Sequence, residues 1–133
     1  MLQLSLMNVV AALIERDGQV LICQRKSGRH AHKWEFPGGK IEPGENPEDA
    51  LARELREELA LEARIGEELY RTEFRYGQGP RIHLKFFRVR EFTGEPVNLQ
   101  FERIEWAARD ALPGYDFLEG DVEFVRSLAD HRL

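Results

Sequence analysis

The hydrophobic and polar positions along the chain change period from segment to segment, and this pattern predicts strands and helices. Near the N-terminus, apolar residues dominate positions 4–15 and 19–24. The turn signal Arg16-Asp17-Gly18 lies between these two segments, so they are expected to form a β-hairpin. The polar positions 27–33 predict a loop. Further strands are predicted at positions 34–36, 63–76, 81–92 and 101–107.

One segment, Pro47–Leu59, has the period of an amphipathic helix. Leu51, Leu55 and Leu59 recur every four residues and would form one apolar stripe. Asn46 is a good N-cap, and proline suits the first helical position. A short turn at 110–112 and a second helix at 118–128 complete the pattern. Strands mixed with two main helices predict an α/β domain whose sheet is covered on both faces.

Size and composition restrict the class of protein. The 133 residues are 42% hydrophobic and 32% charged, which predicts one globular domain spanning residues 1–133. The net charge of −5 argues against a non-specific binder of nucleic-acid polymers, although bound cations can still bring an anionic nucleotide to an acidic site. No apolar run is long enough to span a bilayer, so no membrane partner is expected. Cys23 is the only cysteine, which excludes an internal disulfide and favours a cytoplasmic protein.

The candidate chemistry lies on the first helix. Glu54, Glu57 and Glu58 stand at positions i, i+3 and i+4, so their carboxylates share one helix face and repel one another. A solvated acidic face is one interpretation, and a cluster that binds hard divalent cations is the other. The sequence Pro37-Gly38-Gly39 before the helix predicts a glycine loop that approaches a ligand closely and offers a carbonyl oxygen. This loop favours the metal site.

The spacing of these residues resembles the Nudix box, a motif written G-x5-E-x7-R-E-U-x-E-E-x-G-U in which U is aliphatic. The matching stretch covers residues 39–61. Such a long motif is far more specific than a short glycine pattern. The one departure is Ala60, where the family usually has glycine, and it affects the end of the helix. The positions that match are Gly39, Glu45, Arg53, Glu54, Leu55, Glu57, Glu58 and Leu61.

The resemblance implies a fold, a cofactor and residue roles. It implies the Nudix fold, an α/β/α sandwich with a mixed central β-sheet. Glu54, Glu57 and Glu58 would bind Mg²⁺, which Mn²⁺ can replace, together with the carbonyl of Gly38. Among the catalytic residues Glu54, Arg53 and Glu57, Glu54 would also help to deprotonate the attacking water, and Arg53 would orient the glutamates. The implied reaction is metal-dependent hydrolysis of a nucleoside triphosphate to the monophosphate and pyrophosphate.

Beyond the box, the segment WEFPGGKIE at 34–42 resembles the MutT branch, which removes oxidised guanine nucleotides. This likeness favours 8-oxo-dGTP or a similar modified purine deoxynucleotide as substrate. Other parts resemble the CTP and 5-methyl-dCTP pyrophosphatases, which are the alternative. Gln24 aligns with a base-contacting arginine of the MutT branch, with Arg25 one step on, and Asp121 aligns with a purine-reading asparagine. Asp116 is the second candidate for that asparagine position.

Two further positions complete the expected site. Gln100 stands where the MutT branch has a fourth metal-site glutamate, and Glu102, two residues on, would point to the same face of a strand. Either could serve. Lys40, like Arg25, is a candidate for holding phosphates. The partner would be a small nucleotide, and the protein would be a monomer or a homodimer. A catalytically inactive Nudix-fold binding module and an acidic interaction domain are the competing hypotheses. The intact set of charged residues in the box argues against the first, and the second leaves the glycine loop unexplained.

Overall fold

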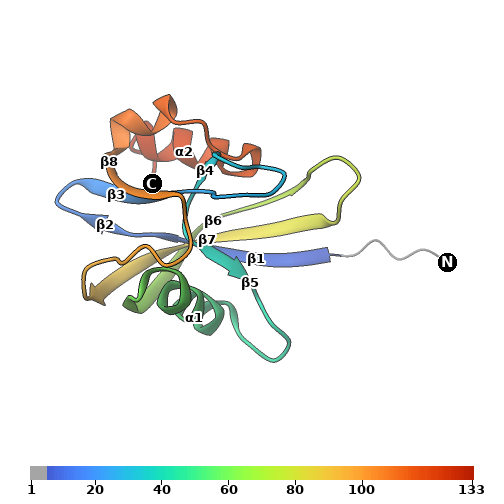
Figure 1. Cartoon of the computed structure of the whole chain (residues 1–133), viewed down its shortest axis with the longest axis horizontal. Helices are drawn as coiled ribbons and strands as arrows, with labels where there is room; N and C mark the ends of the chain where they lie inside the picture. The colour runs from blue at the N-terminus through green and yellow to red at the C-terminus, as the bar shows by residue number, and fades with distance from the viewer. Residues whose placement is uncertain (1–5) are drawn as a thin grey trace.

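The fold is a sandwich in which two helices enclose the strands. The computed structural model describes residues 6–133. The helices α1 (Pro47–Leu59) and α2 (Val122–Ala129) lie on opposite sides of the strands (Figure 1). The expected α/β sandwich with a mixed sheet is therefore confirmed. No helix in the described part of the chain is long and apolar enough to cross a membrane.

The larger sheet is mixed and contains four strands in the order β5-β1-β7-β6. Its centre is β1 (Leu6–Leu13), which runs parallel to β7 (Arg81–Thr93) and antiparallel to β5 (Gly38–Lys40). The outer strand β6 (Glu62–Arg75) forms a long antiparallel hairpin with β7. Gly38 and Gly39, which were predicted to lie in a loop, thus belong to an edge strand, and this pairing places Gly38 beside Ala11.

A second sheet is antiparallel and is built around β3 (Gln19–Gln24). The short strands β2 (Glu15–Arg16) and β4 (Trp34–Glu35) pair with it, as does β8 (Arg103–Ala108). After β8 the chain forms two short 3₁₀ helices, η1 (Arg109–Gly114) and η2 (Glu119–Asp121), before α2.

The predicted hairpin of positions 4–15 with 19–24 is wrong in its extent, and positions 4 and 5 lie outside the described residues. Only β2 pairs with β3 across the turn, because the chain leaves the first sheet after Leu13. The N–H of Leu21 still donates to the carbonyl of Ile14 at 3.0 Å, so the two sheets meet at this point. Val10 to Leu13 are all buried, so both faces of β1 are covered. Such a strand belongs in the centre of a sheet, whereas a strand at the edge of a hairpin need not be buried on both faces.

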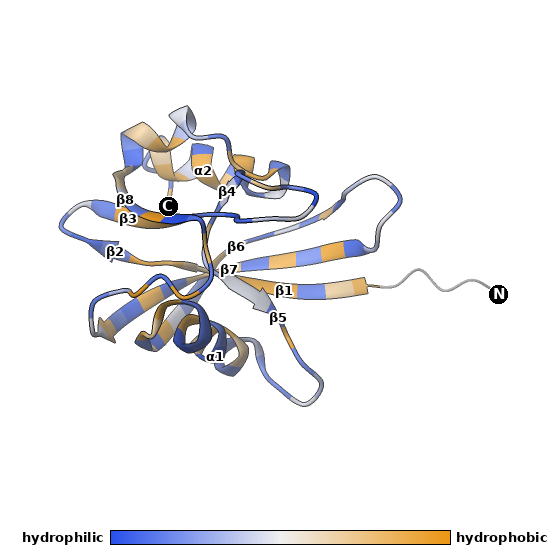
Figure 2. Cartoon of the chain, viewed as in Figure 1, coloured by the Kyte–Doolittle hydropathy of each residue, from blue (hydrophilic) through white to orange (hydrophobic). Residues whose placement is uncertain are grey.

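The core consists of two clusters, one on each face of the larger sheet. Along β1, Ala11 and Leu13 belong to the cluster beneath α2, while Val10 and Ala12 belong to the cluster beneath α1. The period of two places successive side chains on opposite faces, and it appears as alternating colours along β7 in Figure 2. Trp34 and Phe36, Cys23, and the α1 residues Leu51, Leu55 and Leu59 are buried, as predicted.

Helix α1 begins and ends at the predicted residues. The side chain of Asn46 accepts a hydrogen bond from the N–H of Asp49 at 2.8 Å, which satisfies one of the free donors of the first turn. At the other end Ala60 adopts the left-handed conformation, with φ 56° and ψ 31°. Its N–H donates to the carbonyl of Arg56 at 3.1 Å. The helix therefore ends as it would with glycine, with a β-carbon in an unfavourable backbone region.

Candidate active site

A cavity of about 350 Å³ opens between the larger sheet, the end of α1 and the segment before α2. One part of its wall is polar and comes from β5, α1 and Gln100. The other part is formed by the β6–β7 hairpin and the residues before α2. It contains apolar side chains together with a few charged ones. The functional candidates Gly38, Lys40, Glu58, Gln100, Arg25 and Asp121 all line this one cavity.

The two glycines of β5 are required by close approaches at the polar part of the cavity. A β-carbon on Gly38 would lie 2.0 Å from the carbonyl oxygen of Val10. A β-carbon on Gly39 would lie 2.5–2.7 Å from the carboxyl atoms of Glu54. The N–H of Gly38 donates to Glu58 Oε1 at 3.1 Å. The strand therefore packs directly against the glutamates of α1, with no side chain between them.

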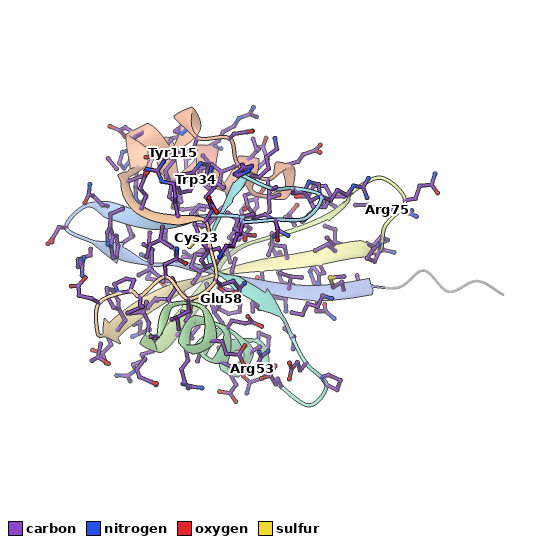
Figure 3. All side chains as sticks on the ribbon, in the orientation of Figure 1. Cys23, Trp34, Arg53, Glu58, Arg75 and Tyr115 are labelled. Carbon is purple, nitrogen blue, oxygen red and sulfur yellow. The ribbon has the colours of Figure 1, made fainter. Side chains whose placement is uncertain are left out.

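Glu58 is the most buried of the three box glutamates, with 3% of its surface exposed. This burial contradicts the solvated acidic face for Glu58. Burial and then the nearby charge of Glu54 raise the pKa of Glu58 to about 9. Burial also raises the pKa of Glu54, although Arg53 opposes the shift. In Figure 3, Glu58 lies on the side of α1 that faces the strands.

Arg53 joins the box glutamates to the loop before the helix. Its Nε and Nη2 donate to the two carboxylate oxygens of Glu45, at 2.7 and 3.0 Å. Its Nη1 donates to Glu54 Oε1 at 3.0 Å and to Glu57 Oε2 at 3.3 Å. Nη2 also donates to the carbonyl of Lys40 at 3.1 Å. The hydrogen bond from Arg53 is the main reason that the pKa of Glu45 falls to about 2. A planar fork with several donors is suited to this orienting role.

The donor set fits a hard divalent cation. Glu54 and Glu58 share a hydrogen bond at a site where burial disfavours two negative charges, and a cation there would replace the proton. Glu57 lies further out, with 58% of its side chain exposed and with Arg53 as its partner. Across residues 6–133, no three His, Cys, Asp or Glu side chains already surround one point. A site with all three glutamates therefore requires Glu57 to rotate away from Arg53.

Of the two candidates for a fourth metal-site group, the structure brings Gln100 to the glutamates. Its Nε2 donates to Glu58 Oε2 at 3.2 Å, and it lines the cavity. Glu102 is exposed, and its N–H donates to the carbonyl of Gln24 at 2.9 Å, which ties it to β3 instead. The side chain of Asn98 holds the turn by accepting from the N–H groups of Gln100 and Phe101, at 3.2 and 2.7 Å.

The far part of the cavity contains a second pair of carboxyl groups. Asp121 is 5% exposed, and burial followed by the charge of Glu35 raises its pKa well above the usual range. Burial also raises the pKa of Glu35, although Arg25 opposes the shift through its charge and a hydrogen bond from Nη1 at 3.1 Å. Asp116, the second candidate, lies on the surface and forms an ion pair with Lys33 at 2.8 Å.

The structure separates Gln24 from Arg25. The amide of Gln24 donates to the carbonyl of His32 at 3.1 Å, and this side chain is not among the described residues that line the cavity. Arg25 does line it, and its Nε–H has no hydrogen-bond partner among residues 6–133. Gln24 is the last residue of β3 and Arg25 follows it, and side chains of adjacent residues in an extended chain point in opposite directions, so only Arg25 faces the cavity.

Sequence reasoning missed three residues that line the cavity. Glu35 lies between Trp34 and Phe36, which are both buried, so strand alternation could have placed it on the opposite face. Tyr76 and His30 pack together with ring centroids 4.5 Å apart, and the hydroxyl of Tyr76 accepts from the N–H of Gly120 at 3.2 Å. No local pattern indicates the contact between His30 and Tyr76, since the loop 27–33 and the β6–β7 hairpin are distant in sequence.

Comparison with known proteins identifies the family. The NUDIX domain profile matches residues 5–128. The CTP pyrophosphohydrolase of Escherichia coli (strain K12) is 37% identical over 125 residues, which cover 93% of this chain and 92% of that protein. The 8-oxo-dGTP diphosphatase of Haemophilus influenzae is 36% identical over 126 residues, which cover 92% of this chain and 91% of that protein.

Two solved structures have the same fold as this chain. The solution structure of the E. coli ORF135 protein superposes with a TM-score of 0.86 at 36% identity, covering 97% of this chain and 92% of that one. The crystal structure of a MutT NUDIX hydrolase from Burkholderia pseudomallei gives a TM-score of 0.84 at 27% identity, covering 92% and 97%. The chain belongs to the NUDIX domain family. It is an enzyme, a Nudix hydrolase with MutT-like relatives, and hydrolases of this family generally use divalent metal ions.

Proposed function

We propose that the protein hydrolyses a nucleoside triphosphate to the monophosphate and pyrophosphate with bound Mg²⁺, and that its favoured substrate is 8-oxo-dGTP or a similar modified purine deoxynucleotide. The observation that carries the proposal is one cavity of about 350 Å³ that lies beside two pairs of carboxyl groups. In the first pair, Glu58 lines the cavity together with Gly38 and Lys40, and Glu54 lies against Gly39, next to Glu58. In the second pair, Glu35 and Asp121 both line the cavity. The first pair suits the phosphates and their metal, and the second suits a base.

At the phosphate end, the carboxylates of Glu54, Glu57 and Glu58 and the carbonyl of Gly38 would hold Mg²⁺, which Mn²⁺ can replace. The metal supplies a bound water of lowered pKa and neutralises charge on the phosphates. Arg53 keeps Glu54 in place, and the raised pKa of Glu54 suits a group that accepts a proton from the attacking water. One water is consumed, one P–O bond breaks, and pyrophosphate leaves. Lys40, at the same end, would contact a phosphate.

At the base end, hydrogen-bonding groups are matched to a guanine edge. Guanine presents two adjacent N–H donors and one carbonyl oxygen. Asp121 and Glu35 offer carboxyl oxygens as acceptors for the donors, and the guanidinium of Arg25 is the available donor for the carbonyl. A buried group left without its partner by the wrong base gives strong discrimination. This complementarity, with the diphosphatase relatives named for 8-oxo-dGTP, supports the purine substrate.

CTP and 5-methyl-dCTP are the second candidate, which the raised pKa values of the carboxyl groups at the base end favour. Cytosine presents one amine donor beside two acceptors, so it matches the base end when one carboxyl group keeps its proton. Burial raises the pKa of both Asp121 and Glu35 in this direction. The side chain of Gln24 donates to the carbonyl of His32 in the loop, so it would not supply a purine with the contact that an arginine makes at this position in the MutT branch. A relative named CTP pyrophosphohydrolase is 37% identical to the chain.

The experiment is a substrate panel. The protein is incubated with 8-oxo-dGTP, dGTP, CTP and 5-methyl-dCTP in Mg²⁺, and the monophosphate and pyrophosphate are quantified. We expect the highest kcat/KM for 8-oxo-dGTP and no turnover in excess EDTA. A preference for CTP selects the second candidate. Undiminished turnover in EDTA rejects the metal mechanism, and no turnover of any nucleotide rejects the proposed function.

A matched pair of variants tests the base end. Asp121→Ala is expected to change the ranking of the four substrates, because it removes a buried acceptor from the cavity. Asp116→Ala removes a carboxylate with 73% of its side chain exposed, so it should keep the wild-type ranking. If the two variants rank the substrates identically, Asp121 does not contact the base.

A further inference from the structure

The segment that carries Asp121 is held from two sides. On one side, the N–H of Leu118 donates to the carbonyl of Trp34 at 2.9 Å, which connects the start of the segment to β4. On the other side, the N–H of Gly120 donates to the hydroxyl of Tyr76 at 3.2 Å, which connects the residue before Asp121 to the β6–β7 hairpin. The second connection is made by a side chain, so a single substitution can remove it.

We propose that Tyr76 is a positioning residue for base recognition, and that its hydroxyl holds the segment 118–121 so that the carboxyl group of Asp121 faces the bound base. The inference rests on the proposed function and names a residue that sets its substrate specificity. The ring of a phenylalanine at this position would not do the same, because it lacks the oxygen that accepts from Gly120.

The ring of Tyr76 is held in place by its neighbours, and the segment 118–121 packs against the same hairpin. Phe74 and Tyr76 lie edge to face with ring centroids 4.9 Å apart, and the ring of His30 lies 4.5 Å from Tyr76 on the same measure. A β-carbon on Gly120 would lie 2.4 Å from the ring of Phe74, so the backbone of the segment is in direct contact with that ring. These contacts keep the hydroxyl of Tyr76 at the N–H group that it accepts from.

The hydroxyl suits this position electrostatically. Burial raises the pKa of Tyr76, and the nearby charge of Asp121 raises it as well, so the hydroxyl stays protonated at neutral pH. A neutral hydroxyl accepts from the N–H of Gly120 without placing a second negative charge beside Asp121. Both Tyr76 and Asp121 line the cavity, so this hydrogen bond lies in the wall that would receive the base.

Base selectivity should depend on this hydrogen bond more than the chemical step does. Hydrogen bonds weaken steeply as donor and acceptor lose alignment, so a small shift of the Asp121 carboxyl group changes which base edge it matches. The proposed metal ligands belong to other elements, α1 and β5. Loss of the Tyr76 hydroxyl should therefore weaken binding of the preferred base and leave kcat almost unchanged.

The test compares Tyr76→Phe with the matched control Tyr115→Phe in the same panel of four substrates. Tyr115 is also half-buried, its hydroxyl donates to Glu105 at 2.5 Å, and it is absent from the described lining of the cavity. In Tyr76→Phe the ratio of kcat/KM between the best and the poorest substrate should fall roughly fivefold, the value of one net hydrogen bond. The fall should come from a higher KM for the best substrate. Tyr115→Phe should keep the wild-type ratio.

A double-mutant cycle decides whether Tyr76 acts through Asp121. If it does, Tyr76→Phe should have no further effect on the ratio in a protein that already carries Asp121→Ala. A loss of the same size in that background would show that the hydroxyl acts on the base directly, and it would overturn the positioning role. A wild-type ratio in Tyr76→Phe with Asp121 intact would overturn it as well, while leaving wild-type hydrolysis and the proposed function standing.

Failure of the proposed function would be seen separately, as a wild type that hydrolyses none of the four nucleotides. Calorimetric binding of 8-oxo-dGMP and CMP to wild type and Tyr76→Phe would then decide the role of Tyr76. A smaller difference in affinity between the two nucleotides in Tyr76→Phe than in wild type would support it, and the same difference in both proteins would overturn it.

Discussion

Replacing Glu58 with glutamine should stabilise the metal-free protein while it abolishes the reaction. Glu58 has a pKa of about 9 in the fold, compared with 4.5 for the unperturbed group. Between these values the folded chain keeps a proton that the unfolded chain releases, so the free energy of unfolding falls as the pH rises. Because pH 7 lies 2.5 units above the unperturbed pKa of 4.5, the protein at pH 7 has lost about 3 kcal/mol of stability relative to low pH.

Glutamine would avoid this loss and would keep most contacts. Its carbonyl oxygen can still accept from the N–H of Gly38, and its amide can donate to Glu54. The contact with Gln100 would become two facing amide donors, which costs about 1 kcal/mol. The net expectation is a variant more stable than wild type by about 2 kcal/mol at pH 7 in EDTA. Turnover should fall at least about 100-fold if Glu58 is a metal ligand, as proposed.

The assay is denaturant unfolding in EDTA at several pH values. The stability difference between Glu58→Gln and wild type should grow by about 1.4 kcal/mol per pH unit between pH 5 and pH 8. Glu57→Gln is the control, because it removes a neighbouring carboxylate whose side chain is 58% exposed. Mg²⁺ should raise the melting temperature of wild type more than that of Glu58→Gln. A stability difference independent of pH, or a variant that unfolds, would refute the reasoning.

Three other variants test the geometry of the site. Ala60→Gly should raise stability by about 0.5–1 kcal/mol, because it removes a β-carbon from a residue with φ 56°. Calorimetry should show a melting temperature about 2–4 °C higher, and a lower one would contradict this. Gly39→Ala should lower kcat at least about tenfold, since its β-carbon would displace the Glu54 carboxylate, whereas Gly114→Ala meets no atom within 4 Å and should retain wild-type kcat. Arg53→Lys should lower kcat by a similar factor in steady-state assays, because an ammonium cannot reproduce the several directed hydrogen bonds of the guanidinium; wild-type kcat would show that charge alone suffices.

The sequence determined the elements whose signals are local. The leucines every four residues, together with Asn46 and Pro47, predicted α1 with its observed bounds. The spacing of the Nudix box identified the glutamates and Arg53, and it required no knowledge of the sheets. The motif also marked Ala60 as the position that affects the end of the helix, and the structure shows that it adopts the left-handed conformation there. These features depend on residues within one or two helical turns of each other, so the chain itself carries enough information.

Tertiary structure decided the features that depend on distant segments. Glu57 and Glu58 are chemically identical neighbours on one helix, but only Glu58 is buried, because β5 and Gln100 pack against it. The long hairpin predicted at the N-terminus gave way to a central β1 because β5 and β7 pair with its two edges and the two core clusters bury its two faces. Arg25 lines the cavity and Gln24 does not because adjacent side chains point in opposite directions. Gln100 reaches Glu58 and Glu102 does not because of the turn held by Asn98. Local propensity could not predict these contacts, since burial and pKa are set by segments that meet only in the folded chain.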